Sequence, residues 1–194
     1  MKRLFIFLVI LLALETVTGW GRIINVPADY PTIQAGIDAS ADGDTVLVQP
    51  AIYRENINFN GHNIVVGSLF VTNQDTSSIA STIIESILSG SSVTFNHGED
   101  NRSAIIGFTI SHARRVDGGG ILSRNSSPRI MWNIIKQNIT NWVGGGILCD
   151  SSGAEISFNT ISGNAGYACG GGIWCSSSHT LIAHNLIYNN TADP

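Results

Sequence analysis

Short hydrophobic runs recur along the second half of the chain at a fixed step of 26 residues. Glycine triplets begin at Gly118, Gly144 and Gly170, and each triplet is followed directly by an apolar pair. A second pattern, Ile-x-x-Asn-x-Ile, recurs at the same step, with copies at residues 130–135, 156–161 and 182–187. Two independent patterns that keep one step indicate a supersecondary unit that stacks on its own copies.

The runs inside each unit have the length and composition of β-strands. They are about 3–5 residues long, rich in β-branched side chains, and separated by Gly, Asn and Ser, without a helical period. A strand that returns parallel to itself one repeat later forms a solenoid coil, about 4.8 Å from the next coil. The leucine-rich consensus is missing, and a propeller blade needs roughly 40 or more residues. The sequence therefore predicts an all-β parallel β-helix, right-handed because parallel crossovers almost always are.

Alternation along a strand assigns the side chains of each coil to two faces. After the second triplet, Ile147 and Cys149 are expected to point inward and Leu148 outward. The next coil repeats this arrangement, with Cys175 inward and Trp174 outward. The inward positions of successive coils should therefore stack into a continuous core.

One asparagine recurs at the same point of each unit, namely Asn133, Asn159 and Asn185. These side chains are expected to stack at a corner, where their amides bond to one another and to the turn backbone. We interpret this ladder as structural. Trp132 and Phe158 share a neighbouring column that is predicted to point into the core, and His184 continues it.

A short amphipathic helix is predicted before the first regular coil. Pro31 suits its first turn, and Ile33 and Ile37 lie four residues apart on one face. This helix is expected to cover the open end of the solenoid. The segment 45–48 is predicted as the first strand, with further strands at 63–66, 82–84 and 92–95.

Two stretches resemble the pectin-lyase-like superfamily of right-handed parallel β-helix proteins, of the secreted bacterial type. Ile24 to Glu55 is similar to the opening unit of that superfamily, and the Gly-Gly-Gly-Ile and Ile-x-x-Asn-x-Ile repeats from Ser103 onward resemble its repeat members. The chain departs from the pattern at Ala51, where the superfamily usually has glycine before the tyrosine. The resemblance implies the β-helix fold over nearly all of the chain after residue 19.

The first residues of the chain predict export, and its last residues predict an incomplete array of coils. A basic start, Lys2-Arg3, precedes an apolar run from Leu4 to Leu14 and then the small or β-branched residues Val17-Thr18-Gly19. This order is typical of a signal peptide over residues 1–19. We assign residues 20–60 to the N-terminal cap and first strand and 61–194 to the coils. The last repeat stops at Pro194 before any glycine triplet, so the array is interpreted as truncated at its C-terminus.

Composition narrows the functional classes. Ten Lys and Arg against 14 Asp and Glu, with 12% charged residues, exclude a nucleic-acid or anionic-membrane binder. A hydrophobic fraction of 43% excludes intrinsic disorder. Three cysteines cannot all pair internally. Cys149 and Cys175 are predicted to be free thiols that fill the core, and Cys169 lies in a loop.

Known members of the superfamily include polysaccharide lyases, polygalacturonases and pectin esterases, whose sites need clustered carboxylates. From residue 103 onward the acidic residues are Asp117, Asp150, Glu155 and Asp193. No two of them share a column in adjacent coils. Arg124 lies beneath Asp150, which predicts a surface ion pair. We therefore assign no catalytic residue, no metal site and no cofactor.

Three aromatic residues remain as candidates for binding. Trp174 continues the outward column of Leu122 and Leu148, and Trp142 and Tyr167 lie in the loops before the triplets. Sugar rings stack on such side chains, so they predict a shallow carbohydrate platform; the alternative is an ordinary apolar surface.

These features predict an exported, non-catalytic module in the secreted, periplasmic or cell-surface compartment. Its partner would be a polysaccharide or a surface protein, with no nucleic acid and no membrane after removal of the signal peptide. Two alternatives stay open. In the first, the chain is a fragment of a polysaccharide lyase or glycoside hydrolase whose active site lies on missing coils. In the second, it is a purely structural spacer.

Overall fold

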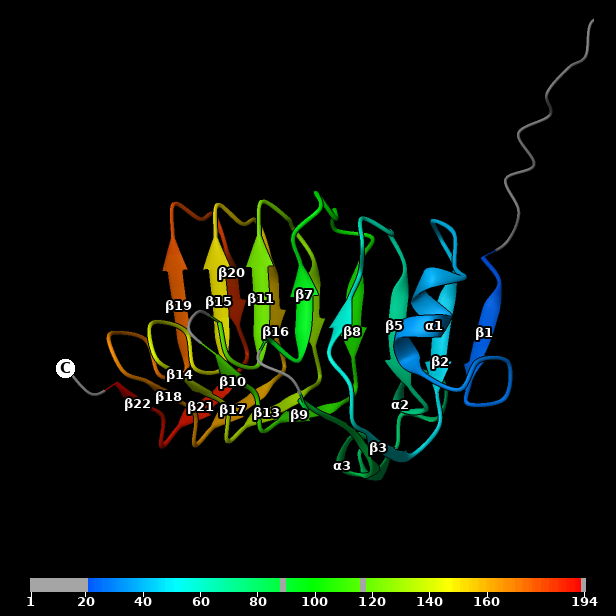
Figure 1. Cartoon of the computed structure of the whole chain (residues 1–194), viewed down its shortest axis with the longest axis horizontal. Coiled ribbons are helices and arrows are strands. Elements are labelled where there is room, and N and C mark those ends of the chain that lie inside the picture. Colours follow the sequence, from blue (N-terminus) through cyan, green and yellow to red (C-terminus); the bar gives the residue numbers. More distant parts are fainter. Residues whose placement is uncertain (1–20, 88–89, 116–117, 193–194) are drawn as a thin grey trace, which may run out of the picture.

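The predicted strands pair with their counterparts in the next repeat, and every pair of named strands is parallel. The computed structural model describes residues 21–87, 90–115 and 118–192. In this part the chain forms a parallel β-solenoid of about six turns with little helix (Figure 1). The predicted signal peptide, residues 1–19, lies outside the described residues. None of the helices in the described part is long and apolar enough to cross a membrane.

Two large sheets run along the solenoid. The first holds seven strands, which are β1 (Ile23–Val26), β2 (Thr45–Val48), β5 (Val65–Ser68), β8 (Ala104–Ile106), β12 (Arg129–Met131), β16 (Glu155–Ser157) and β20 (Leu181–Ala183). The second holds six, which are β3 (Ala51–Tyr53), β6 (Thr82–Glu85), β9 (Thr109–Ser111), β13 (Ile134–Lys136), β17 (Thr160–Ser162) and β21 (Leu186–Tyr188).

Two smaller sheets complete the coils. One holds five strands, β4 (Ile57–Asn58), β7 (Val93–Phe95), β11 (Ile121–Arg124), β15 (Ile147–Asp150) and β19 (Ile173–Ser176). The other holds four short strands, β10 (Arg114–Arg115), β14 (Ile139–Thr140), β18 (Ala165–Gly166) and β22 (Thr191–Ala192). The predicted strands at 45–48, 82–84 and 92–95 are confirmed. The strand predicted at 63–66 begins only at Val65, because Asn63 is bound in a polar corner.

The step of 26 residues is the register of the structure. Ile121 pairs with Ile147, which pairs with Ile173, and Ile135 pairs with Ile161 in the same way. Ile121, Ile135, Ile147 and Ile161 are fully buried in one core that runs the length of the solenoid. Burying such a side chain stabilises the fold by about 1.5–3 kcal/mol.

The predicted N-terminal helix is present as α1 (Ile33–Asp38). Thr32 caps it by accepting a hydrogen bond from the Ala35 N–H, so Pro31 precedes the helix rather than beginning it. Ile33 and Ile37 are fully buried against β1, β2 and β4. The prediction that 45–48 is the first strand is wrong, because β1 precedes the helix and pairs with β2.

The asparagine ladder is confirmed, and it is doubled. Asn133 donates from its backbone N–H to Asn159 Oδ1 at 2.9 Å, and Asn159 donates likewise to Asn185 at 2.9 Å. The sequence analysis missed a second ladder at the next corner, formed by Asn138, Asn164 and Asn190. Its signal was the same step of 26 residues. Both ladders replace the backbone hydrogen bonds that the chain loses where it turns.

The glycine triplets form the tight corner before each strand of the five-stranded sheet. The first glycine of each triplet has a positive φ, between 60° and 70° at Gly118, Gly144 and Gly170. The middle glycine of each triplet is needed for a different reason. A Cβ atom at Gly119 or Gly145 would clash with carbonyl oxygens of the neighbouring coil.

The outward column that contains Leu122 and Leu148 is not a surface. Both side chains are buried, at 3% and 1% exposure, in a second small cluster with Val143. The loops that carry the glycine triplets fold back over this column, since a Cβ atom at Gly144 would lie 2.8 Å from the Leu148 Cβ. Leu148 therefore points away from the core of the solenoid, as predicted, but its side chain is not exposed to solvent.

Candidate functional site

The four-stranded sheet forms the side of the solenoid where two of the three predicted binding aromatics lie. Its outward column consists of Arg114, Ile139, Ala165 and Thr191 in register. Because Ala165 and Thr191 are small, the column leaves a shallow hollow. This hollow is lined by Ile139, Ala165, Gly166, Tyr167 and Thr191.

Tyr167 lines this hollow, and Trp142 lies in the corresponding loop one coil earlier. Trp142 lies in the loop between β14 and β15, and Tyr167 in the loop between β18 and β19. The Ala168 N–H donates to the Trp142 carbonyl at 2.8 Å, and the Tyr167 N–H donates to the Thr140 carbonyl at 3.2 Å. These bonds hold the two loops one coil apart. Trp142 is 56% exposed and Tyr167 55%, and neither makes a ring contact within the described part of the chain.

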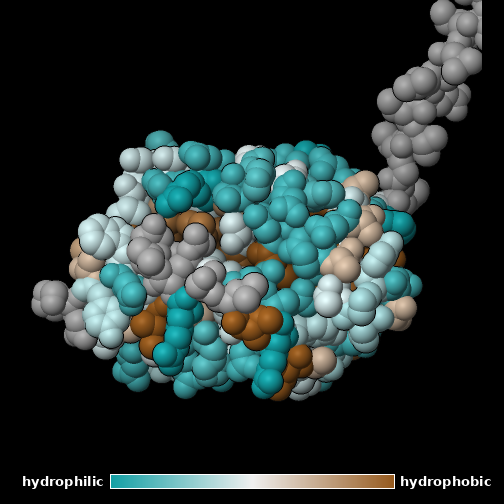
Figure 2. Space-filling view, in the orientation of Figure 1, coloured by the Kyte–Doolittle hydropathy of each residue, from teal (hydrophilic) through white to brown (hydrophobic). Residues whose placement is uncertain are grey.

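Most residues on the visible face of the solenoid are polar. Figure 2 shows a largely hydrophilic face, on which hydrophobic side chains form separate small patches rather than one continuous surface. Large exposed rings on such a face are therefore local features and not part of a broad apolar interface.

Trp174, the third predicted binding residue, is placed differently. It points outward from β19, as predicted, and pairs in register with Leu148. Its side chain is partly buried and packs against the cluster of Leu122, Val143 and Leu148. Trp174 therefore packs against Val143, in the loop that also contains Trp142. It does not form a flat exposed surface with Trp142 and Tyr167.

The prediction that Trp132 and Phe158 belong to the core is wrong. Trp132 is 38% exposed and Phe158 41%. Trp132 stacks on Phe158, and Phe158 stacks on His184, which gives a column of rings on the surface. The physical reason is the backbone, since all three residues have φ values of +57° or +58°. A left-handed residue interrupts the alternation of an extended strand and turns its side chain outward. Phe70 lies at the start of this column, 5.4 Å from Trp132.

The rings of this column are not a second sugar platform. Trp132 and Phe158 lie 4.8 Å apart with an interplanar angle of 5°, and Phe158 and His184 lie 5.0 Å apart at 13°. Each inner ring therefore covers the face of its neighbour and presents only its edge to solvent. The column stabilises the stacking of coils.

Ser111, His112 and Glu85 form a cluster that the sequence analysis did not identify. The Ser111 hydroxyl lies 3.0 Å from His112 Nδ1, and Glu85 Oε1 lies 3.2 Å from the same nitrogen. A serine hydrolase needs its serine and its carboxylate on opposite nitrogens of the imidazole. Ser111 is also only 2% exposed. This cluster lacks the geometry of a catalytic triad, and Glu85 is held instead by Arg54 at 2.9 Å.

The predicted ion pair between Arg124 and Asp150 is confirmed at 3.0 Å, with the two residues in register. Asp117 lies outside the described residues. Within the described ranges, no three His, Cys, Asp or Glu side chains cluster in a way that could hold a metal ion.

The three cysteines are free thiols, but their environments differ. Cys149 is buried as predicted, and Cys169 is exposed in its loop. The prediction that Cys175 is buried is wrong: it is exposed because no later coil within the described residues covers it. A hydrogen bond from Cys149 lowers the pKa of Cys175 to about 7, and the same contact, together with burial, raises the pKa of Cys149.

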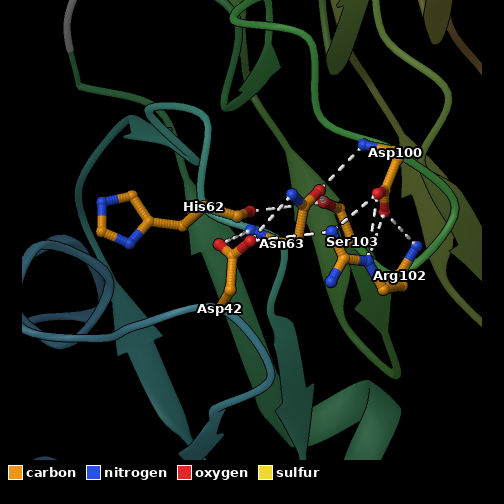
Figure 3. A network of polar contacts seen from close by, with 6 residues as sticks. All are labelled: Asp42, His62, Asn63, Asp100, Arg102 and Ser103. Carbon is orange, nitrogen blue, oxygen red and sulfur yellow. Dashed lines mark hydrogen bonds and ion pairs between the residues drawn. The ribbon is translucent and has the colours of Figure 1, made fainter. Parts of the chain in front are cut away.

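A polar corner ties the irregular coils of the N-terminal half together (Figure 3). Asn63 donates from its N–H to Asp42 Oδ1 at 2.9 Å and accepts at Oδ1 from the Asp100 N–H and the Ser103 hydroxyl. Arg102 binds Asp100 at 2.9 Å and reaches Asp42 at 3.6 Å. Hydrogen bonds from Asn63 lower the pKa of Asp42, and those from Arg102 lower the pKa of Asp100.

Glu99 is a buried carboxylate next to this corner, with 1% exposure. It accepts hydrogen bonds from the Ser126 hydroxyl at 2.7 Å, the Gly61 N–H at 2.9 Å and the His97 N–H at 3.0 Å. Burial by itself raises the pKa of Glu99, but these donors outweigh it and hold the pKa below its ordinary value of 4.5. The carboxylate therefore joins three corners of the chain in its charged form.

We expect Glu99 to make the stability of the protein depend on pH. Its pKa is lower in the folded than in the unfolded chain, so its contribution is complete above about pH 4.5 and is lost as the pH falls through the folded value. Urea unfolding between pH 3 and pH 7 should show Glu99→Gln less stable than the parent near neutral pH, with the difference shrinking on acidification. A difference that stays constant over this range would contradict the assignment.

Comparisons with known proteins do not assign this chain to a family. No family model matches the chain, and neither the curated proteins nor the solved structures contain a significant match. The candidate site therefore has to be interpreted from its own residues. These are the exposed rings of Trp142 and Tyr167, and Arg114 in the outward column of the four-stranded sheet.

Proposed function

We propose that this chain is a non-catalytic β-solenoid module that binds glycans through the exposed rings of Trp142 and Tyr167. The observation that carries the proposal is the pair of large aromatic side chains, each more than half exposed and held on successive coils, of which Tyr167 lines a hollow. Aromatic rings offer a broad apolar face with low conformational entropy, which suits the apolar face of a sugar ring. Trp174 acts as a support for the loop of Trp142.

Arg114 favours acidic glycans as the ligand. It lies next to Ile139 in the outward column of the four-stranded sheet, and it has no ion pair among the described residues. A guanidinium binds carboxylate or sulfate groups through paired hydrogen bonds. A polysaccharide that carries such groups could place a sugar ring against Tyr167 and an anionic group against Arg114.

The wider context of the proposal comes from the sequence. We propose that the coils wind right-handed, as in the pectin-lyase-like superfamily, and that residues 1–19 direct the chain out of the cytoplasm. A secreted, periplasmic or cell-surface location would bring the module to polysaccharides or to surface proteins. The resemblance of residues 24–55 and of the repeats from Ser103 onward supports the first point, and the basic start followed by the apolar run from Leu4 to Leu14 supports the second.

Glycan binding is tested with an array of acidic and neutral polysaccharides, followed by titration calorimetry on those that bind. We expect Trp142→Ala and Tyr167→Ala each to weaken binding about tenfold, because each removes a stacked ring worth about 1.4 kcal/mol. Tyr188→Ala is the matched control, since Tyr188 is a tyrosine with 46% exposure on β21, away from the hollow.

Three outcomes would contradict this proposal. Binding that is unchanged in both ring variants would remove the platform, and binding lost equally in Tyr188→Ala would point to another surface. Release of unsaturated or reducing ends from polygalacturonate or alginate would show that the chain is an enzyme.

A further inference from the structure

A second hollow lies on the outer face of the seven-stranded sheet, between helix α2 (Phe70–Asn73) and strand β12. Helix α2 follows β5 directly (Figure 1) and lies over Gly67, where a Cβ atom would approach Val71 Cγ1 to 2.7 Å. Ile106 and Met131 continue the outward column of Gly67 on the next two strands. Both side chains are only partly buried, which leaves the hollow beside the helix.

This second hollow has room for one aromatic ring with a short substituent. Its volume is about 260 Å³, and an apolar cavity of about 150 Å³ already holds benzene. Its apolar lining consists of Phe70, Val71, Ile106, Met131 and Trp132. Trp132 stacks on Phe158 and packs against Phe70, so the edge of its ring is the part left for a ligand. Ring edges and thioether sulfurs both make favourable contacts with an aromatic ligand.

Arg129 brings a positive charge to the second hollow. It lies two residues before Met131 on the same face of β12. Its Nε is buried without a hydrogen-bond partner, and its guanidinium forms no ion pair within the described part of the chain. Its register partner on the next coil, Glu155, accepts instead from the Ser157 hydroxyl at 3.1 Å. A buried donor without a partner calls for an explanation, and an anion held in the hollow supplies one.

We propose that the second hollow binds a small aromatic carboxylate, with its ring against Phe70, Met131 and Trp132 and its carboxylate on Arg129. A guanidinium holds a carboxylate through two parallel hydrogen bonds, and the Arg129 Nε–H donates one of them. The apolar lining keeps water from this contact, which strengthens it. The site lies on the seven-stranded sheet and is separate from the glycan surface proposed at the four-stranded sheet, so each proposal stands or fails by itself.

Titration of the full chain with benzoate, phenylacetate and phenylpropanoate, each beside its neutral amide, tests this proposal. Two-dimensional NMR follows the indole N–H signals of the four tryptophans, and Trp132→Phe assigns the signal of Trp132. At least one acid should shift this signal with a dissociation constant on the order of 0.1–1 mM, which is ordinary for so few atoms. Its amide should bind at least tenfold more weakly, because the amide lacks the charge that Arg129 meets.

Substitutions at two arginines locate the carboxylate. Arg129→Gln should weaken binding of the acid at least tenfold, and Arg129→Lys should retain part of the affinity, because it keeps the charge but not the paired donors. Arg114→Gln is the matched control and should bind like the parent protein. Arg114 also lacks an ion pair in the described ranges, but it lies on the four-stranded sheet.

Several results would overturn the proposal. One is equal binding of an acid and its amide, and another is a Trp132 signal that none of the three acids shifts at millimolar concentration. Unchanged binding in Arg129→Gln, with a far-UV circular dichroism spectrum like that of the parent, would separate the carboxylate from Arg129. An equal loss in Arg114→Gln would mean that the acids respond to the overall charge of the protein and not to this hollow.

Discussion

Replacing Asn159 by alanine should destabilise the solenoid by about 3–5 kcal/mol, because the side chain is buried and every one of its polar atoms is used. Asn159 Oδ1 accepts from the Asn133 N–H at 2.9 Å, and Nδ2 donates to the Ile130 carbonyl at 2.7 Å. Truncation leaves both backbone groups buried without a partner, at about 1–3 kcal/mol each. Urea unfolding followed by circular dichroism measures the loss.

Asn141→Ala is the control for the ladder variant. Asn141 is an exposed asparagine in the loop before the second glycine triplet, and its truncation should change the free energy of unfolding by no more than about 0.5 kcal/mol. Equal effects of the two substitutions would mean that the ladder contributes no more to stability than a surface amide.

A methyl group at Gly145 should be almost as damaging, with an expected loss of about 3 kcal/mol or more. The added Cβ would clash with the carbonyl oxygens of Ala165 and Gly171. Those oxygens belong to the backbone of the next coil, and Gly145 itself donates to the Gly170 carbonyl at 3.1 Å. The coils can therefore relieve the clash only by moving apart and breaking ladder hydrogen bonds. The thermal midpoint of Gly145→Ala measures this cost.

Gly163→Ala separates crowding from backbone strain. Gly163 has a φ of +63°, and no atom lies within 4 Å of a Cβ built there. Its substitution should cost only the strain of a left-handed alanine, about 1–2 kcal/mol. A Gly163→Ala variant as unstable as Gly145→Ala would show that close stacking of the triplets is not what requires glycine.

The candidate site was predicted in part. The position of Trp142 and Tyr167 in the loops before the triplets indicated exposed rings, and both rings are more than half exposed. Trp174 was expected to share their surface, yet it lies partly buried against Leu148 and Val143. Sugar binding by these rings stays a prediction. Loop conformation decides exposure, and a loop that folds back over a strand leaves no sign in the alternation of that strand.

The irregular coils of the N-terminal half were hardest to predict. The buried Glu99 bonds to Ser126 and Gly61, which lie 27 and 38 residues away along the chain. No constant step connects these positions, so no column could be drawn through them. A carboxylate in a polar sequence also resembles an ordinary surface residue until burial and three hydrogen-bond donors converge on it.

The sequence by itself determined the step of 26 residues, the parallel register, the asparagine ladder and the inward columns of the strands. These features follow from nearest-neighbour stacking, in which each residue contacts its own equivalent one coil away. Tertiary structure alone decided the exposure of the corner and loop residues. Trp132 turns outward because its backbone is left-handed, and Leu148 is covered by a returning loop. Both outcomes depend on how the chain bends between strands, and hydrophobic alternation carries no information about those bends.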